Sequence, residues 1–280
     1  MAAFDKLPVA KPGDAVLEIE SVCGASAVTS ARACSPLKLL TPRARGRSVW
    51  ACTSSFGGGL VAGDQTRLDL RLGRSARCFL GTQASTKIYR NPLKRPCGHV
   101  TQAVLAEDSL LVFAPDPVQA FAGSSYTQRQ EFQLAEGAAL VLLDWFTSGR
   151  AARGERWEFS RLQSRNDVFR AGARIFLDSI LFDATDGPLT TSMRAGRFNC
   201  FALLLLMGDL LGPSIAALLE SVSALPVTRH APLVASASPI PGGAVLRIAG
   251  AAAETVGREV HRHLGLLGEL LGDDPWARKW

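Results

Sequence analysis

A short pattern that recurs about every 30 residues places the strongest constraint on how this chain can fold. Its copies are centred on Leu72, Leu105 and Leu134. Each copy ends an alternating segment, makes a short polar turn and continues into a more apolar segment, as in Cys78-Phe79-Leu80. Repeats of this kind form stacked β units with one shared core, so the sequence predicts a mainly β, stacked or solenoid-like (β-helical) body.

The repeat also sets the predicted organisation of the chain. Residues 1–14 are expected to form a loose N-terminal leader and residues 15–190 the stacked β body. Residues 191–280 should form a C-terminal α+β part packed on the body as one continuous unit. Outside the repeat copies, the alternation of apolar and polar residues predicts four short strands at residues 15–19, 25–33, 37–40 and 49–52.

Helices are predicted only late in the chain, and two of them are expected. The first covers residues 208–225 and follows an apolar strand at Cys200–Met207. The second is one amphipathic helix over residues 252–271, with Gly272 placed to cap its C-terminus. Two strands lie between the helices, at residues 233–237 and 244–249.

Charge and composition limit the classes of partner. The formal net charge is +6, with arginine as the main cation, and arginine binds carboxylates well, which favours acidic protein partners. No nucleic-acid recognition motif and no basic tail is present, so nucleic acid is not expected to bind. The six cysteines form no C-x-x-C pair, and neither a secretory signal nor a membrane-spanning run is visible. We therefore expect a cytoplasmic protein with free thiols and no membrane contact.

A glycine-rich segment, Gly57-Gly58-Gly59 and Gly63, precedes the first repeat copy. Gly58 and Gly63 have the spacing of a phosphate-binding loop, but Asp64 and Gln65 stand where that loop needs Lys and Ser or Thr. A dinucleotide-binding fingerprint would need a helix where this chain alternates like a strand. The glycines are therefore interpreted as structural, at points of close backbone approach or positive φ.

Each repeat copy is followed by a polar segment predicted to be irregular, at residues 82–87, 115–119 and 144–150. Equivalent strand ends in a stacked array lie on the same side. We therefore expect polar side chains from all three segments near one face. They are Thr82, Gln83, Asp116, Asp144 and Ser148.

Three carboxylates lie beside glycine or tryptophan: Asp64, Asp144 and Glu155. As structural residues, Asp64 would cap a turn and Glu155 would pair with Arg150 or Arg153. As an alternative, Asp144 and Glu155 could serve as the acid/base pair of an enzyme on a β-solenoid. No motif supports a Ser or Cys nucleophile, and no residue is predicted to be catalytic.

Histidine and cysteine offer little for a closed metal site. Cys97 and His99 supply two ligands in a Pro-rich loop, and Glu259 and His263 supply two on one helix face. A closed tetrahedral site needs four ligands, so neither pair predicts one.

Several motifs in one order resemble a known family. GGGLVAGD (residues 57–64) is followed by GTQASTKIYR (residues 81–90), and then by LLVFAPDPVQAF (residues 110–121). LVLLDWFTSGRAARGERWEF (residues 140–159) continues the series, and PWARKW (residues 275–280) ends the chain. Together they resemble the UreD-type, or UreH-type, urease accessory proteins.

The resemblance implies a mostly β body with a pair of helices and a non-catalytic role. Members of that family scaffold nickel insertion into urease apoprotein, together with a UreF-type accessory protein and a UreG-type GTPase. Nickel is proposed to pass along a polar route through the protein, so the resemblance implies Ni²⁺ in transit and no tightly bound cofactor. Hard oxygen ligands, few at each point, suit such a route.

Carried onto this sequence, the resemblance makes Asp64, Asp144 and Glu155 the candidate nickel path, with Thr82, Gln83 and Ser85 as further lining. The same motifs single out other residues without assigning them a role. They are Gly57, Gly58, Gly59, Gly63, Lys87, Tyr89, Arg90, Trp145, Gly149 and Arg150.

A partner-binding surface is predicted on the last helix, where Arg258 and Arg262 would dock a UreF-type helix or another acidic surface. Two alternatives to a urease maturation factor stay open from the sequence. One is the enzyme with Asp144 and Glu155 as its acid/base pair, and the other is a purely structural β-solenoid adaptor.

Overall fold

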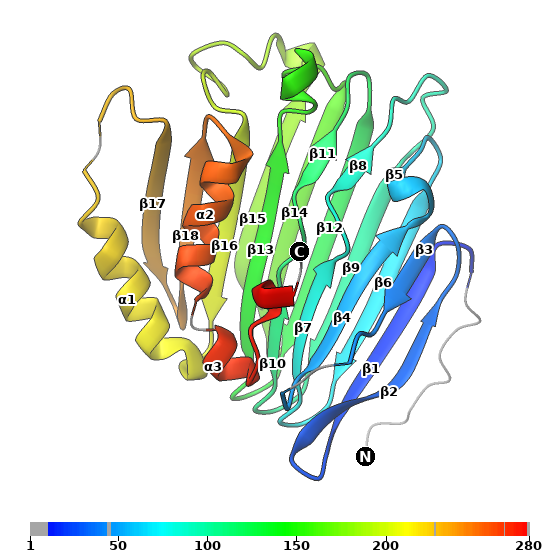
Figure 1. Cartoon of the computed structure of the whole chain (residues 1–280), viewed down its shortest axis with the longest axis vertical. Helices are drawn as coiled ribbons and strands as arrows, with labels where there is room; N and C mark the ends of the chain where they lie inside the picture. Colours follow the sequence, from blue (N-terminus) through cyan, green and yellow to red (C-terminus); the bar gives the residue numbers. More distant parts are fainter. Residues whose placement is uncertain (1–10, 44–45, 227, 266, 279–280) are drawn as a thin grey trace.

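Two β-sheets that face each other form the body of the protein (Figure 1). The structure, a computed structural model, describes residues 11–43, 46–226, 228–265 and 267–278. Residues 1–10 of the predicted leader and the last two residues of the C-terminal motif therefore lie outside the described residues. The first strand, β1, begins at Asp14, one residue before the strand predicted at residues 15–19.

In the described part of the chain, seven strands form the first sheet, in the order β15-β14-β12-β9-β6-β1-β2. Its inner strands run parallel, and the hairpins β1–β2 and β14–β15 close its two edges with antiparallel pairs. The strands are β1 (Asp14–Val22), β2 (Ala25–Ala33), β6 (Gln65–Leu72), β9 (Gly98–Leu105), β12 (Ser125–Leu134), β14 (Arg161–Arg170) and β15 (Ala173–Asp183).

The second sheet has the order β17-β18-β16-β13-β10-β7-β4-β3. Parallel strands β4, β7, β10 and β13 belong to the coils, and the late strands extend the sheet in antiparallel fashion. The strands are β3 (Leu37–Leu40), β4 (Val49–Ser55), β7 (Arg77–Thr82), β10 (Leu110–Phe113), β13 (Ala139–Thr147), β16 (Cys200–Met207), β17 (Leu233–Ile240) and β18 (Gly243–Gly250).

The predicted repeat is confirmed by the strand register. Leu72 pairs with Leu105, and Leu105 pairs with Leu134, along the first sheet. On the second sheet, Leu111 lies between Cys78 and Leu140. Each repeat copy is thus one coil of a β-solenoid of about four turns, as the periodicity indicates.

The prediction of irregular polar segments is partly wrong, because residues 144–147 belong to β13, residue 82 ends β7, and residues 86–87 and 118–119 lie in short strands. Short strands β5 (Gly59–Leu60), β8 (Thr86–Ile88) and β11 (Val118–Ala120) pair in parallel, and β11 also pairs with β13. Through β11 they join the second sheet, and we call β5, β8 and β11 the wall of short strands. A segment of two or three residues has no strand pattern of its own, and it pairs here because the neighbouring coil supplies its hydrogen-bond partners.

Hydrophobic residues fill the space between the sheets, and a second core covers the outer face of the second sheet. The inner core joins Leu70 and Phe132 of the first sheet to Leu111 and Leu205 of the second. Strands β13 and β16 are buried on both faces, which explains why their sequences are apolar without alternation.

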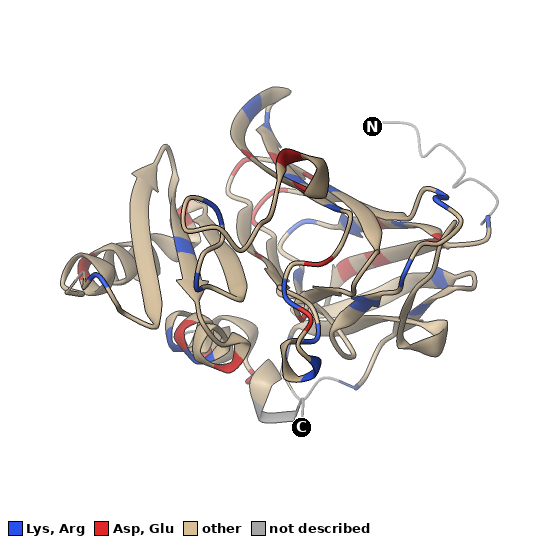
Figure 2. Cartoon of the chain, turned by 90° about the horizontal axis from the view of Figure 1, so that it is seen from above, with Lys and Arg blue, Asp and Glu red and all other residues tan. Residues whose placement is uncertain are grey.

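Helices provide the second core. α1 (Gly212–Ser223), α2 (Ala253–Leu264) and α3 (Leu267–Leu271) pack on the outer face of the second sheet (Figures 1 and 2). The 3-10 helices are η1 (Phe56–Gly58), η2 (Ala151–Arg153), η3 (Ala184–Asp186), η4 (Asp209–Leu211) and η5 (Pro275–Arg278).

The single helix predicted over residues 252–271 is wrong in one respect, because it is divided into α2 and α3. The division falls at Gly265, which caps α2, and glycine is a poor helix former. Gly272 follows α3 with a φ of 73°, the left-handed conformation expected of a C-terminal cap.

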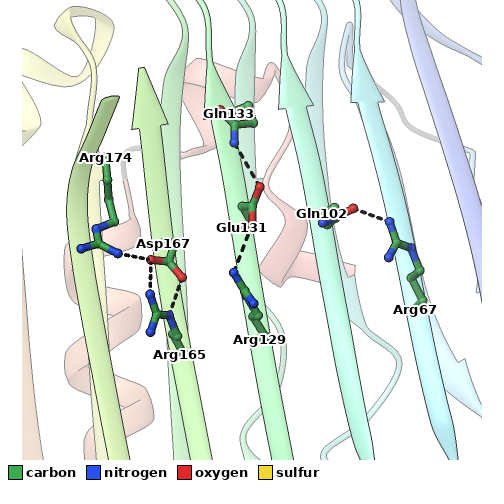
Figure 3. Close-up of polar contacts among 8 residues, drawn as sticks. All are labelled: Arg67, Gln102, Arg129, Glu131, Gln133, Arg165, Asp167 and Arg174. Atoms are coloured by element: carbon green, nitrogen blue, oxygen red, sulfur yellow. Dashed lines mark hydrogen bonds and ion pairs between the residues drawn. The ribbon is translucent and has the colours of Figure 1, made fainter. Parts of the chain in front are cut away.

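Paired charges cover the outer face of the first sheet (Figure 3). The pattern Arg-x-Asp/Glu occurs at Arg67–Asp69 on β6, Arg129–Glu131 on β12 and Arg165–Asp167 on β14. Parallel register sets Arg129 beside Arg165 and Glu131 beside Asp167. Like charges on adjacent strands repel, and the opposite charge two residues along each strand offsets that repulsion.

Gly59 should be intolerant of any side chain. Its backbone is extended, but a Cβ there would overlap the carbonyl oxygen of Lys87 across the β5–β8 pair. Gly59→Val should lower the free energy of unfolding by about 1–3 kcal/mol or prevent folding. Gly212→Ala is the matched control, since no atom lies within 4 Å of its Cβ position, and it should not destabilise. Urea denaturation followed by circular dichroism measures both, and equal stability would contradict the close approach.

Asp167 should contribute to stability in a pH-dependent way. Its side chain is 1% exposed, and hydrogen bonds from Arg165 hold the pKa of Asp167 below its ordinary 3.8. The stabilisation is present above that value and is lost as pH falls through the lower folded-state pKa. Asp167→Asn should cost about 1–3 kcal/mol at neutral pH and less in acid. Urea denaturation of wild type and Asp167→Asn across that pH range tests this, and a difference in stability that does not change with pH would contradict it.

Candidate functional site

A polar cavity lies between the two sheets, next to the wall of short strands. First-sheet residues on one side, including Thr66, His99 and Gln128, face second-sheet residues on the other, including Thr82 and Asp144. The volume open to the centres of water molecules is about 90 Å³. Polar and apolar side chains share its walls, and the volume is large enough for several water molecules.

Asp144 is the buried carboxylate of this cavity. It lies on β13 and is 7% exposed. Its Oδ1 accepts a hydrogen bond from Gln128 Nε2 at 3.0 Å, and its Oδ2 accepts from Ser164 Oγ at 2.6 Å and Asn166 Nδ2 at 2.8 Å. All three donors are neutral, and they come from strands β12 and β14 of the opposite sheet.

Burial raises the pKa of Asp144, and the hydrogen bonds from Ser164, Asn166 and Gln128 oppose that rise. No Lys or Arg of the described chain forms an ion pair with Asp144. A buried carboxylate without a cationic partner is costly when ionised, and its interaction with a proton or a metal cation is correspondingly favourable.

His99 on β9 adds an imidazole to the cavity wall. Its Nδ1 lies 2.8 Å from Thr66 Oγ1, and its Nε2 lies 3.1 Å from Thr101 Oγ1. Desolvation lowers the pKa of His99 to about 4, so the ring is neutral at physiological pH. A neutral imidazole is the form that can ligate a metal.

Hydroxyl and carboxyl groups line the cavity where β7 and β10 end. Thr82 Oγ1 donates to Asp116 Oδ2 at 2.8 Å and accepts from the Asp116 backbone N–H at 2.7 Å. Trp145 also lines the cavity, and its indole N–H donates to the carbonyl of Pro115 at 2.8 Å. These bonds fix the corners at which each coil turns from the second sheet into the short strands.

The cavity unites some of the predicted residues and separates others. Asp144, Thr82, Ser85, Gly58 and Trp145 line it, and so does Asp116. Of the five residues expected near one face, Thr82, Asp116 and Asp144 meet in the cavity, whereas Gln83 and Ser148 do not line it.

Asp64 and Glu155 lie outside the cavity, in the structural arrangements that the sequence also allows. Asp64 is in an exposed turn, where its Oδ2 accepts from the Val61 N–H at 2.9 Å. Glu155 forms an ion pair with Arg150 and accepts from the Ala122 N–H at 3.3 Å. The three candidate carboxylates therefore do not share one pocket.

The remaining residues of the family motifs mostly build the wall of short strands. Tyr89 donates its hydroxyl to the Gly57 carbonyl at 2.9 Å, and its ring packs edge-on against Phe121. The guanidinium group of Arg150 lies over the Phe121 ring, 4.3 Å from its centroid. Lys87 pairs with Gly59 in the wall, and Gly63 and Gly149 have φ angles of 95° and 111°. Arg90 is exposed.

The partners of Asp144 are the residues that sequence reasoning missed. Gln128 pairs in register with Ser164, and Gln130 pairs with Asn166, whose Oδ1 accepts from Gln130 Nε2 at 2.8 Å. A signal was present: polar residues occupy inward positions of consecutive coils, where Leu or Val is expected.

The predicted partner-binding arginines lie on α2. Arg262 forms an ion pair with Glu259 on the same helix, and Arg258 donates to Thr255 Oγ1 at 3.3 Å. His263 also contacts Glu259, at 3.1 Å. Whether this face binds a partner stays a prediction.

Among the described residues, no group of three or more His, Cys, Asp and Glu side chains is arranged to hold a metal ion. The six cysteines are free. No helix within the described ranges combines the length and the apolar character needed to cross a membrane.

Known proteins match nearly the whole chain. The family model described as UreD urease accessory protein matches residues 11–280. A urease accessory protein UreD from Sorangium cellulosum (strain So ce56) is 46% identical, over 96% of this chain and 85% of that protein. One from Anaeromyxobacter sp. (strain Fw109-5) is 37% identical, over 96% and 90%. Urease accessory protein D from Oryza sativa subsp. indica is 31% identical, over 99% of both chains.

Asp144 should affect stability with the opposite pH trend to Asp167. Because its folded-state pKa is raised, its contribution is fully present below the ordinary pKa of 3.8 and is lost as pH rises through the folded-state value. The stability of Asp144→Asn relative to wild type should therefore increase as pH rises above 3.8. Urea denaturation at several pH values measures the difference. A difference that is constant or decreases with pH would show that Asp144 is not desolvated.

Proposed function

The chain belongs to the UreD family of urease accessory proteins, and from this premise we propose that it is a non-catalytic scaffold in urease maturation. In this proposal it binds urease apoprotein together with a UreF-type accessory protein and, through the complex, a UreG-type GTPase. It helps to deliver Ni²⁺ to the urease active site. The nickel ion is cargo, and no cofactor is bound tightly.

The polar cavity is the observation that carries the proposal. An ion that crosses a β-solenoid between its sheets must exchange part of its hydration shell for side-chain oxygens. The cavity offers the Asp144 carboxylate, the Asp116 carboxylate, and the hydroxyls of Thr82 and Ser85. Oxygen ligands at sparse sites bind Ni²⁺ weakly, and weak binding allows the ion to leave as readily as it enters.

Asp144 has the properties expected of the central residue on such a route. When ionised, it supplies negative charge inside the protein, and the three neutral donors around it hold the carboxylate without cancelling that charge. Burial increases the attraction of this carboxylate for a cation, and the three hydrogen bonds that its oxygens already accept reduce that attraction. The neutral imidazole of His99 is a ligand type that suits nickel, and it lines the same cavity.

Asp64 and Glu155 would act at the outside of the protein if they belong to the route. Both carboxylates already have partners, Asp64 in its turn and Glu155 with Arg150. Loss of Glu155 would free the Arg150 side chain and disturb its packing on Phe121. Structural and transport roles must therefore be separated by experiment at these two positions.

The enzyme alternative gains no support from a specific contact. Asp144 lines the internal cavity, whereas Glu155 lies in a surface depression with Tyr89 and Arg90. An acid/base pair has to reach one reacting group from two sides. The separation of Asp144 from Glu155 therefore favours the maturation role over an enzyme that uses this pair.

Removal of the carboxylate charges in the cavity should reduce nickel loading of urease without dissociating the complex. Asp144→Asn and Asp116→Asn retain the shape of each side chain and remove its charge, so the yield of nickel per urease active site should fall several-fold. The measurement is the nickel content of urease after co-expression with the full accessory set, beside co-purification of the partners. Asp186→Asn, on the exposed η3, is the matched control and should leave nickel content unchanged.

One outcome would contradict the cavity route. Normal nickel content in the Asp144→Asn, Asp116→Asn double variant would remove the cavity from the route. Asp64→Ala and Glu155→Ala extend the test to the other two candidates, which should also lower nickel content while the complex survives. Loss of the partners in either variant would instead identify that carboxylate as structural.

A further inference from the structure

Stacked loops form one end of the solenoid, at the top of Figure 1 and facing the viewer in Figure 2. Backbone hydrogen bonds tie each loop to the next. The Tyr89 N–H donates to Leu60 at 2.9 Å, Asn91 donates to Gly123 at 3.0 Å, and Gly123 donates to Glu158 at 2.9 Å. The loop ends are therefore ordered by the same stacking that orders the strands.

Unpaired cations gather on these loops. Arg90, Lys94 and Arg95 are exposed, and none of them forms an ion pair with a residue of the described chain. The side chain of Arg95 lies against Gly63, and that of Arg90 lies against Gly123. Arg153 is also exposed and lies close enough to lower the pKa of Glu155.

The turn that carries these cations is held in one conformation. Asn91 is buried, its Nδ2 donates to the Arg95 carbonyl at 2.7 Å, and its Oδ1 accepts from the Arg95 N–H at 3.1 Å. Lys94 has a φ of 49° within this turn. A fixed turn loses little conformational entropy on binding, so a partner can bind these cations with a small entropic penalty.

Exposed aliphatic side chains lie among the cations. Leu93 is 63% exposed at the tip of the turn, and Val61 is 50% exposed on the adjacent loop. We name Val61, Arg90, Leu93, Lys94 and Arg95 the loop-end surface. Apolar groups ringed by arginine are typical of protein interfaces, whereas phosphate binding gains nothing from Leu93 or Val61.

Carboxylates near the loop-end surface leave its positive charge in excess. Glu155 is paired with Arg150. Asp64 keeps its negative charge, because the Val61 N–H that binds it is neutral, and this one charge faces the three cations Arg90, Lys94 and Arg95. By comparison, Arg262 on α2 is already bound to Glu259. The loop-end surface therefore has more positive charge free for a partner than the α2 face has.

We propose that the loop-end surface docks an acidic, partly apolar segment of a protein partner in the urease maturation complex. The proposal rests on the maturation role proposed above and assigns the contact that holds the partner. Carboxylates of the partner pair with Arg90, Lys94 and Arg95, and an apolar side chain of the partner covers Leu93 and Val61. The arginines give the contact specificity and a strong dependence on salt.

The test compares two surfaces in the full chain. Arg90→Glu, Lys94→Glu and Arg95→Glu are combined in one variant, and Arg258→Glu with Arg262→Glu in another. Each is co-expressed with urease apoprotein and the UreF-type accessory protein, and retention of both partners is measured at low and high salt. The loop-end variant should lose at least one partner several-fold, and wild-type retention should fall as salt rises. The α2 variant should retain both partners.

Leu93→Ala keeps all the charges, so it should weaken retention of the same partner. The size of that loss should depend less on salt than the loss in the triple charge variant. Circular dichroism and thermal unfolding establish that the triple variant is folded. A folded triple variant that retains both partners as wild type does would overturn the docking surface while the maturation role stands. A wild-type chain that retains neither partner would overturn both.

A nucleic-acid partner is the competing outcome. A fluorescently labelled duplex DNA serves as the probe, with wild type and the triple variant compared at low salt. Binding by wild type that is lost in the variant, combined with unchanged protein retention, would show that the cations recognise phosphate and would overturn the proposal.

Discussion

Parallel, in-register stacking of the coils is the constraint on which the rest of the structure depends. Each residue of a coil lies beside its equivalent in the next coil, joined by backbone hydrogen bonds. Leucine therefore stacks on leucine, as at Leu72, Leu105 and Leu134, and buries a continuous apolar row. A favourable position is repeated with each coil, and an unfavourable one is repeated as well.

The outer face of the first sheet shows how the chain handles an unfavourable stack. Arg129 lies beside Arg165, and the repulsion between them is offset within each strand by Glu131 and Asp167. Inside the body, Phe113 on β10 lies in register between Leu80 on β7 and Leu142 on β13, where apolar contact is favourable. The same backbone register thus supports a solvated charged face and an apolar interior, because side chains alternate between the two.

The interior changes character along each coil, and that change creates the cavity. Near the turns the inward residues are leucine, whereas near the short strands they are Thr66, His99, Gln128 and Ser164. Buried polar groups are costly unless they are hydrogen-bonded, and the network around Asp144 meets that demand with donors from two neighbouring coils. Such a network is possible only because consecutive coils hold their side chains at fixed spacing.

The late strands and helices complete the second sheet. β16 pairs antiparallel with β13, so the coil ladder ends without an exposed edge at that point. α1 and α2 then cover the outer face, where Leu218, Val256 and Val260 meet β16 and β18. The apolar run of β16 is explained by burial on both sides.

The sequence by itself determined the coil period, the strands and the class of fold. Strands β2, β3 and β16 have their predicted bounds, because alternation and apolar runs are local properties of the chain. The tertiary structure alone decided which polar residues meet: Asp144 with Gln128, Ser164 and Asn166 in the cavity, and Glu155 with Arg150 on the surface. It also divided the last helix at Gly265 and paired the short strands. The physical reason is that the coil period is a local pattern of apolar and polar residues. Contacts between the two sheets depend instead on where the chain of each coil passes from one sheet to the other.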